Sequence, residues 1–137
     1  MKKIHVLLFG YGNTGKQIAG YVTKHGGHLC AVVDRDRCLN GVKVADTAVT
    51  WDEEAVLAKV KADIAVITIG GGLKEIAPTV EKCMRRGINV ITTAEDALFP
   101  YATSPKLATD LDRIAKEYGV TLTASGFQDC FWLHAVT

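Results

Sequence analysis

The hydrophobic positions of this chain follow two spacings, short continuous apolar runs and longer stretches with an apolar residue every three or four positions. The first spacing predicts β-strands and the second predicts amphipathic helices. Strands are predicted at residues 4–9, 29–33, 63–69, 88–92 and 120–124, with a weaker short strand within 42–49. Helices are predicted at residues 14–25, 53–60, 73–86 and 104–118. This alternation predicts an α/β fold, a doubly wound parallel sheet of about six strands with helices on both faces.

The apolar residues of each predicted helix recur on one side, which we expect to pack against the sheet. In the first helix they are Ile18, Tyr21 and Val22. In the third they are Leu73, Ile76, Ala77, Val80 and Met84, and in the last they are Leu107, Leu111, Ile114 and Tyr118. The run at 63–69 is apolar throughout, as expected of a strand buried on both faces.

A glycine-rich turn follows the first strand and opens the first helix, with the sequence Gly10-Tyr11-Gly12-Asn13-Thr14-Gly15. In a dinucleotide-binding turn of this type, Gly10 makes the tight turn and Gly12 lets the backbone approach a pyrophosphate. Gly15 lets the helix pack close to the strand. The unpaired N–H groups of the helix N-terminus attract phosphate without a basic residue. We therefore expect a Rossmann-type fold that binds NAD or NADP through residues 10–15.

An acidic residue at the end of the second predicted strand supports this interpretation. Asp34 lies 19 positions after Gly15, where a carboxylate can accept hydrogen bonds from the adenosine ribose and repel a 2′-phosphate. Arg35 and Arg37 follow it, and either guanidinium could cover the adenine or pair with a 2′-phosphate. The pattern is therefore compatible with NAD, NADP or both. The alternative for all three residues is a solvated loop.

Further site loops are expected where the other parallel strands end, because ligands bind at that edge of the sheet. Gly70, Gly71 and Gly72 would contact the ribose and nicotinamide half, the alternative being a flexible strand-to-helix turn. Thr93, Ala94 and Glu95 would lie near the nicotinamide amide, although Glu95 and Asp96 can equally be solvated loop acids. On the substrate side we expect Ser125, Gly126, Phe127, Gln128 and Asp129.

Composition narrows the possible partners. The chain has 137 residues, 48% of them apolar, which suits one domain with a real core. A formal charge of +1, with basic residues scattered among acidic ones, predicts neither a nucleic-acid nor a membrane partner. The chain starts directly with a predicted strand, so we expect a cytoplasmic protein. Cys30, Cys38, Cys83 and Cys130 lack metal-ligand spacing, and neither a metal site nor a disulfide is expected.

Four segments together resemble a known family across nearly the whole chain. They are residues 10–15, the glycine turn at 69–72, Asn89-Val90-Ile91-Thr92-Thr93-Ala94-Glu95-Asp96, and Ser125-Gly126-Phe127-Gln128-Asp129. The sequence resembles the N-terminal coenzyme-binding domain of the dihydrodipicolinate-reductase-like NAD(P)-dependent amine and amino-acid dehydrogenases, in particular the 2,4-diaminopentanoate dehydrogenases. Gln128-Asp129-Cys130 departs from the proline and glycine that the family often carries, so substrate contacts are not carried over.

The resemblance implies hydride transfer between a nicotinamide and the amine or imine carbon of a small diamino acid such as 2,4-diaminopentanoate. It also implies a homo-oligomer in the full-length enzyme. We expect residues 1–124 to be the dinucleotide-binding domain and 125–137 to begin a connection to a substrate domain absent from this chain. The catalytic acid or base is unassigned. A dihydrodipicolinate-type reductase and a non-catalytic NAD(P)-sensing regulatory module remain the alternatives.

Overall fold

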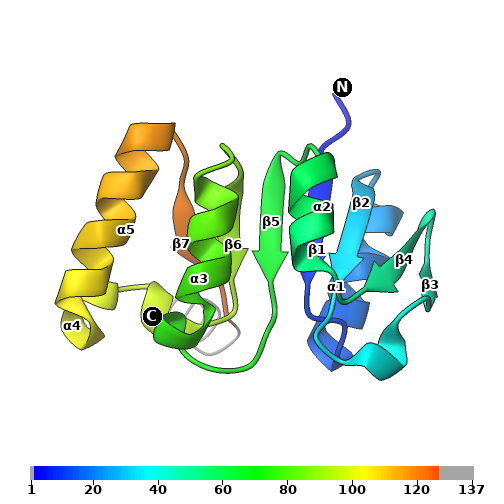
Figure 1. Cartoon of the computed structure of the whole chain (residues 1–137), viewed down its shortest axis with the longest axis horizontal. Coiled ribbons are helices and arrows are strands. Elements are labelled where there is room, and N and C mark those ends of the chain that lie inside the picture. The colour runs from blue at the N-terminus through cyan, green and yellow to red at the C-terminus, as the bar shows by residue number, and fades with distance from the viewer. Residues whose placement is uncertain (1, 127–137) are drawn as a thin grey trace, which may run out of the picture. The chain divides into compact units, whose positions relative to one another are not determined.

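The computed structural model describes residues 2–126, and the chain divides into two compact units, residues 1–68 and residues 69–137. The first unit contains five strands and two α-helices among its described residues (Figure 1). In chain order they are β1 (His5–Phe9), α1 (Asn13–Lys24), β2 (His28–Val33), the 3₁₀ helix η1 (Arg37–Leu39), β3 (Lys43–Val44), β4 (Thr47–Thr50), α2 (Glu53–Lys59) and β5 (Ile64–Ile67).

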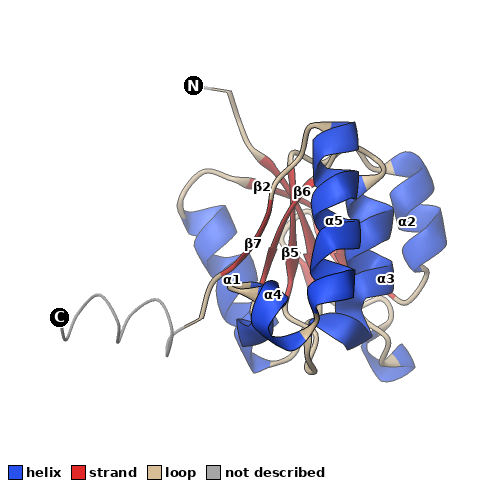
Figure 2. Cartoon of the chain, turned by 90° about the vertical axis from the view of Figure 1, so that its left-hand side faces the viewer, coloured by secondary structure: helices blue, strands red, loops and turns tan. Residues whose placement is uncertain are grey.

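The strands of the first unit lie in the order β3-β4-β2-β1-β5. β1 pairs in parallel with β2 on one side and β5 on the other, and β2 pairs in parallel with β4. Helix α1 lies on one face of these strands and α2 on the other (Figure 2). The chain reverses its winding direction beside β1, and the loop after such a strand is where open α/β sheets bind ligands.

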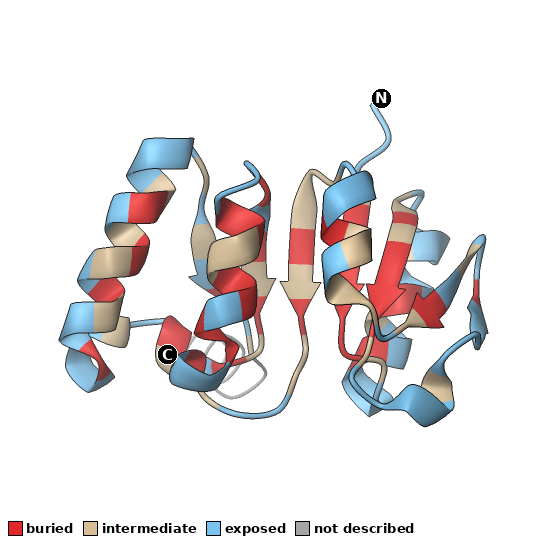
Figure 3. Cartoon of the chain, viewed as in Figure 1, coloured by how far each residue is buried: buried red, intermediate tan, exposed pale blue. Residues whose placement is uncertain are grey.

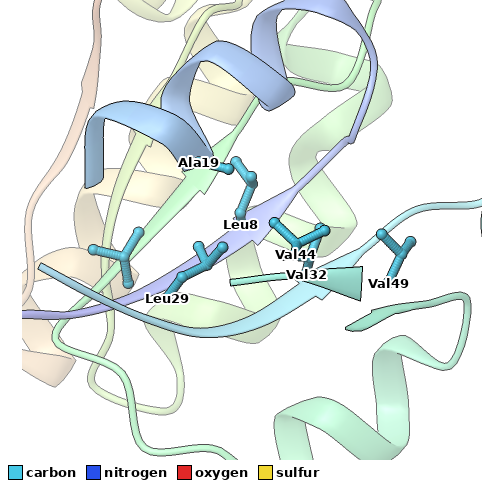
Figure 4. Close-up of a cluster of buried hydrophobic side chains, with 7 residues drawn as sticks. Leu8, Ala19, Leu29, Val32, Val44 and Val49 are labelled. Atoms are coloured by element: carbon cyan, nitrogen blue, oxygen red, sulfur yellow. The ribbon is translucent and has the colours of Figure 1, made fainter. Parts of the chain in front are cut away.

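The core of the first unit lies between α1 and its strands (Figure 4). Leu8, Val32 and Val49 are at most 2% exposed and pack with Ala19 of α1. Burial of such side chains is the main favourable term in folding. The expected inward face of α1 is correct for Ile18 and Val22 but wrong for Tyr21, which is 62% exposed. Its ring stacks on that of His25 one turn later instead.

The second unit combines a parallel strand pair with a group of helices. Its elements are α3 (Leu73–Met84), β6 (Asn89–Thr92), the 3₁₀ helix η2 (Glu95–Ala97), α4 (Pro100–Thr103), α5 (Pro105–Tyr118) and β7 (Leu122–Ala124). The predicted stripe of α3 is buried, as Figure 3 shows for the ribbon. On α5, Leu111 and Ile114 are buried as predicted, whereas Leu107 is half-buried and Tyr118 is 39% exposed.

The α/β fold class, with parallel strands joined through helices, is confirmed, and two details differ from the sequence prediction. The weak third strand is two strands, because residues 43–44 and 47–50 pair antiparallel as a hairpin. The turn between them places Ala45 at φ +51°, so the chain reverses without glycine. Strand β5 was expected to be buried along its whole length, but its side chains at Ile64 and Val66 are only half-buried.

Asp63 joins the start of β1 to the segment before β5, and it gives a pH-dependent test of the first unit. Its Oδ2 accepts a hydrogen bond from the His5 backbone N–H at 2.8 Å, and its Oδ1 lies 3.7 Å from Lys2 Nζ. The His5 N–H, and secondarily the Lys2 charge, lower the pKa of this carboxyl below its ordinary value. A lowered folded-state pKa contributes stability above the unfolded-state pKa, and this stability is lost as pH falls through the folded-state value.

We therefore expect Asp63→Asn to lower the free energy of unfolding at about pH 7 and to have little effect at about pH 2. Asparagine keeps an acceptor oxygen for His5 and removes only the charge. Urea unfolding of both proteins at the two pH values is the measurement. An equal difference at both would contradict the assignment of the effect to the ionised carboxylate.

Candidate functional site

The glycine turn after β1 is tightly packed at its first and last glycines. Gly10 has φ +93°, a region that favours glycine, and an added Cβ would lie 2.7 Å from Thr68 Oγ1. At Gly15, the third residue of α1, an added Cβ would overlap the carbonyl oxygen of Gly10. The Thr68 hydroxyl lies 3.0 Å from the Phe9 carbonyl oxygen and 3.1 Å from that of Gly10. Thr68, the residue after β5, thus supports the turn.

Gly12, by contrast, faces open space. An added Cβ would meet no protein atom within 4 Å, and Gly12 has ordinary extended backbone angles, φ −76° and ψ −161°. Packing within the described residues therefore does not require glycine at this position. Asn13 and Thr14, the first two residues of α1, are also exposed.

The N-terminus of α1 carries no compensating side chain. No side chain caps its first turn among the described residues, and that turn has no acidic residue. Helix α2 of the same unit differs, because Asp52 caps it by accepting from Ala55 N at 3.0 Å and Glu53 and Glu54 lie in its first turn. The open N–H groups and positive dipole end of α1 are suited to bind an anion.

Asp34 links the glycine turn to the loop after β2. Its Oδ2 accepts from the Tyr11 backbone N–H at 2.6 Å, and its Oδ1 accepts from the Asp36 N–H at 2.8 Å. A carboxylate has about four acceptor sites, so each oxygen keeps capacity for another donor. The predicted ribose acid therefore also positions the turn, a role that spacing alone did not indicate.

The two arginines after Asp34 differ in their surroundings. Arg35 is exposed. The Arg37 guanidinium carbon lies 4.3 Å from the ring centroid of Trp51, the residue after β4. Trp51 is 46% exposed. The cation and the ring form a cation–π pair at the surface.

In the second unit, the triple glycine forms the start of α3. Gly71 has φ +113°, and Gly72 is the N-cap of the helix, while Gly70 is exposed. The Gly72 N–H donates to Glu75 Oε2 at 3.1 Å, and the Leu73 N–H donates to both Asp96 oxygens, at 2.9 and 3.0 Å. Asp96 therefore caps α3 and is not a solvated loop acid.

The loops after β6 and β7 lie together in the second unit. The Ser125 N–H donates to the Thr92 carbonyl at 2.9 Å, and a Cβ on Gly126 would lie 3.7 Å from Glu95 Cγ. Ala94, whose N–H donates to Thr92 Oγ1, is buried, and Thr93 is half-buried. Glu95 is exposed. The other predicted substrate-side residues, Phe127, Gln128 and Asp129, lie outside the described residues.

The comparison with protein families identifies the chain. Residues 10–122 match the family model described as the NAD-binding domain of homoserine dehydrogenase. The chain belongs to this family. It is thus an NAD-binding domain of the dehydrogenase type, and the expectation of a nicotinamide dinucleotide as cofactor is confirmed for NAD.

Two relatives of this NAD-binding domain are named for amine substrates. A 2,4-diaminopentanoate dehydrogenase from Acetoanaerobium sticklandii is 28% identical over 92% of the chain and 38% of its own length. An amine dehydrogenase structure from Mycobacterium smegmatis is 31% identical with a TM-score of 0.88, over 96% of the chain and 41% of that protein. The structure of GenD2 from gentamicin A biosynthesis, solved with NAD, is 26% identical with a TM-score of 0.72, over 91% of this chain and 35% of that protein. The chain thus spans about two fifths of the length of the first two relatives.

The described part of the NAD-binding domain holds neither a metal-ligand cluster nor a membrane-spanning helix. Residues 2–126 contain no group of three or more His, Cys, Asp and Glu side chains arranged for a metal ion. No helix among them has the length and apolar character to cross a bilayer. Cys30, Cys38 and Cys83 form no disulfide among the described residues. Burial raises the pKa of Cys30, whose thiol donates to the Val6 carbonyl at 3.1 Å.

Several residues of the NAD-binding domain that shape the candidate site were missed from sequence. Thr68 supports the turn, Trp51 stacks on Arg37, and Glu75 and Asp96 cap α3. Glu75 had a local signal, because an acid three residues after an N-cap is a known capping pattern. Thr68, Trp51 and Asp96 had none, since their partners lie 14 to 59 positions away.

The uncapped N-terminus of α1 makes Thr14→Asp informative. We expect the new carboxylate to stabilise the NAD-binding domain by about 0.3–1 kcal/mol through the helix dipole. We also expect it to weaken NADH binding by roughly tenfold, because it repels the pyrophosphate. Urea unfolding and calorimetric titration measure the two effects, with Thr14→Asn as the uncharged control. The loss of affinity should diminish as ionic strength rises, and unchanged affinity would place the phosphates elsewhere.

Proposed function

We propose that this chain is the cofactor-binding part of an NAD(P)-dependent dehydrogenase that transfers hydride between the nicotinamide and a carbon bearing an amine or imine. The proposed substrate is a small diamino acid such as 2,4-diaminopentanoate. The observation that carries the proposal is the likeness to two relatives named for amine substrates, each matching more than nine tenths of this chain. Both relatives are longer, so the reaction is proposed for the whole protein.

The residues of the first unit suit the adenosine and pyrophosphate end of the cofactor. Open space at Gly12 and the uncapped N-terminus of α1 fit a pyrophosphate held by backbone N–H groups of residues 10–15. Asp34, with acceptor capacity left on both oxygens, would bind the ribose hydroxyls. Arg35 and Arg37 would lie around the adenine.

The loops of the second unit suit the nicotinamide end in this proposal. Gly70, Gly71 and Gly72 would offer backbone groups to the second ribose, and Thr93, Ala94 and Glu95 would lie near the carboxamide. Ser125 and Gly126 would border the substrate. The bound cofactor supplies the hydride chemistry, and the protein supplies position and exclusion of water. Residues 1–124 would then form the dinucleotide-binding domain, followed by the connection to the substrate domain.

Two measurements test the proposal. Calorimetric titration of the chain with NADH should give saturable binding, and its absence would contradict the cofactor assignment. The full protein, incubated with NAD⁺ or NADP⁺, should form reduced cofactor with 2,4-diaminopentanoate and not with homoserine, followed by the absorbance of the reduced nicotinamide. Homoserine is the informative comparison because the family model carries its name. Turnover of homoserine alone would overturn the amine assignment.

A further inference from the structure

The loop after β2 and the end of β4 carry a feature that bears on the choice between NAD and NADP. Resting on the proposed function, we propose that Trp51 is a cofactor-selecting residue. By holding Arg37 against its ring beside Asp34, Trp51 makes the adenosine site bind NAD in preference to NADP. Neither dinucleotide preference nor a role for Trp51 follows from the spacing of residues along the chain.

The three residues lie at the same edge of the first unit. β2 and β4 are parallel, and the Asp34 N–H donates to the Thr50 carbonyl at 2.9 Å, so Asp34 and Trp51 follow neighbouring strand ends. Arg37 begins η1, three positions after Asp34. Asp36 caps that 3₁₀ helix by accepting from the Cys38 N–H at 2.9 Å. This short capped segment sets the position from which Arg37 reaches Trp51.

The Arg37 guanidinium lies over the ring of Trp51. The guanidinium carbon is 4.3 Å from the ring centroid, within the range of a cation–π contact. An arginine that selects NADP must direct its N–H groups at the 2′-phosphate, usually as a bidentate pair. In this proposal, an Arg37 side chain that reaches a 2′-phosphate beside Asp34 leaves the ring of Trp51, so the cation–π contact favours the arrangement without that phosphate.

Asp34 is held in the orientation that disfavours a 2′-phosphate. Its two oxygens accept from the backbone N–H groups of Tyr11 and Asp36 at 2.6 and 2.8 Å. Rotating the carboxylate away from the ribose would break both bonds. The negative charge thus remains where a 2′-phosphate would lie, while the remaining acceptor sites suit the two ribose hydroxyls of NAD.

The same pair can also contribute affinity. Trp51 is 46% exposed and follows the strand end that neighbours the ribose acid, and the Arg37 guanidinium lies over its ring. Adenine is attached directly to that ribose and stacks on aromatic rings and guanidinium planes. Removing the ring should therefore weaken the binding of every adenine nucleotide. Binding of nucleotides with a 2′-phosphate should weaken less, because Arg37 is released to contact that phosphate.

The experiment compares NADH and NADPH, and their adenosine halves 5′-AMP and 2′,5′-ADP, by calorimetry on wild type, Trp51→Phe, Trp51→Leu and Trp51→Leu/Arg37→Gln. Wild type should bind NADH at least about tenfold more tightly than NADPH. Trp51→Leu should weaken NADH by roughly five- to a hundredfold, the range of one base–aromatic stack. Trp51→Leu should also reduce the preference for NADH, measured as the ratio of the NADH affinity to the NADPH affinity, by about fivefold or more. Trp51→Phe should retain most of this preference. Adding Arg37→Gln to Trp51→Leu should restore the preference, because the released arginine is then no longer available to the 2′-phosphate.

The outcomes separate this inference from the proposed function. An unchanged NADH/NADPH ratio in Trp51→Leu, or equal wild-type affinities for the two, would overturn the role of Trp51 and leave the proposed function standing. Binding of neither dinucleotide to wild type would overturn both. Because Trp51 and Arg37 are exposed, the variants should have the same urea midpoint of unfolding as wild type. This measurement verifies that they are folded.

Discussion

Replacing Gly15 with alanine is expected to destabilise the first unit by about 3 kcal/mol or more, a large fraction of the total stability of a typical domain. The added Cβ would overlap the carbonyl oxygen of Gly10 and would also lie 2.8 Å from its carbonyl carbon. Neither the Gly15 backbone nor the Gly10 carbonyl can move away easily. Gly15 is part of the α1 backbone, and Gly10 has φ +93° and is hydrogen-bonded to Val33 through its N–H.

The same helix offers a matched control. Gly20 lies in the middle of α1, is exposed, and has no atom within 4 Å of the position of an added Cβ. Gly20→Ala should stabilise the protein by about 0.5–1 kcal/mol, because alanine loses less backbone entropy in a helix. Urea unfolding followed by circular dichroism measures both variants. If Gly15→Ala unfolded with the wild-type midpoint, the close approach of α1 to the turn would be refuted.

Replacing Gly12 with valine should have the opposite profile, a stability within about 1 kcal/mol of wild type, because Gly12 is the N-cap of α1, and a loss of NADH affinity of about a hundredfold, or about 2.7 kcal/mol. The protein has room for the side chain, and the extended backbone at Gly12 is open to any residue. The side chain would instead occupy the space in which the pyrophosphate approaches the backbone in the proposed site. Calorimetric titration with NADH gives the affinity, and urea unfolding gives the stability.

A graded series distinguishes a bound pyrophosphate from a general disturbance of the turn. Gly12→Ala should lose less affinity than Gly12→Val, since the obstruction grows with side-chain volume while the fold is unaffected. Adenosine without phosphates should bind all three proteins alike. Wild-type NADH affinity in Gly12→Val would mean that the phosphates do not approach this residue, whatever the fold.

Much of the fold could be predicted because its signals are local. The apolar run of β1 and the inward stripe of α3 each depend on residues within about a dozen positions of one another, and both are confirmed. The errors arise where a helix face is broader than its neighbours can cover. Tyr21 and Tyr118 follow helical spacing, yet each lies at the margin of its stripe and remains exposed, at 62% and 39%.

The chain's sequence by itself determined the order of strands and helices, the place of the glycine turn and the identity of the acid after β2. Those properties are encoded in short-range periodicity, in glycine and in spacing. Only the tertiary structure decided that Asp34 holds Tyr11, that Asp96 caps α3 and that Arg37 rests on Trp51. These contacts join segments 14 to 23 positions apart, and a partner at that distance is selected by how the elements pack, which no local pattern records.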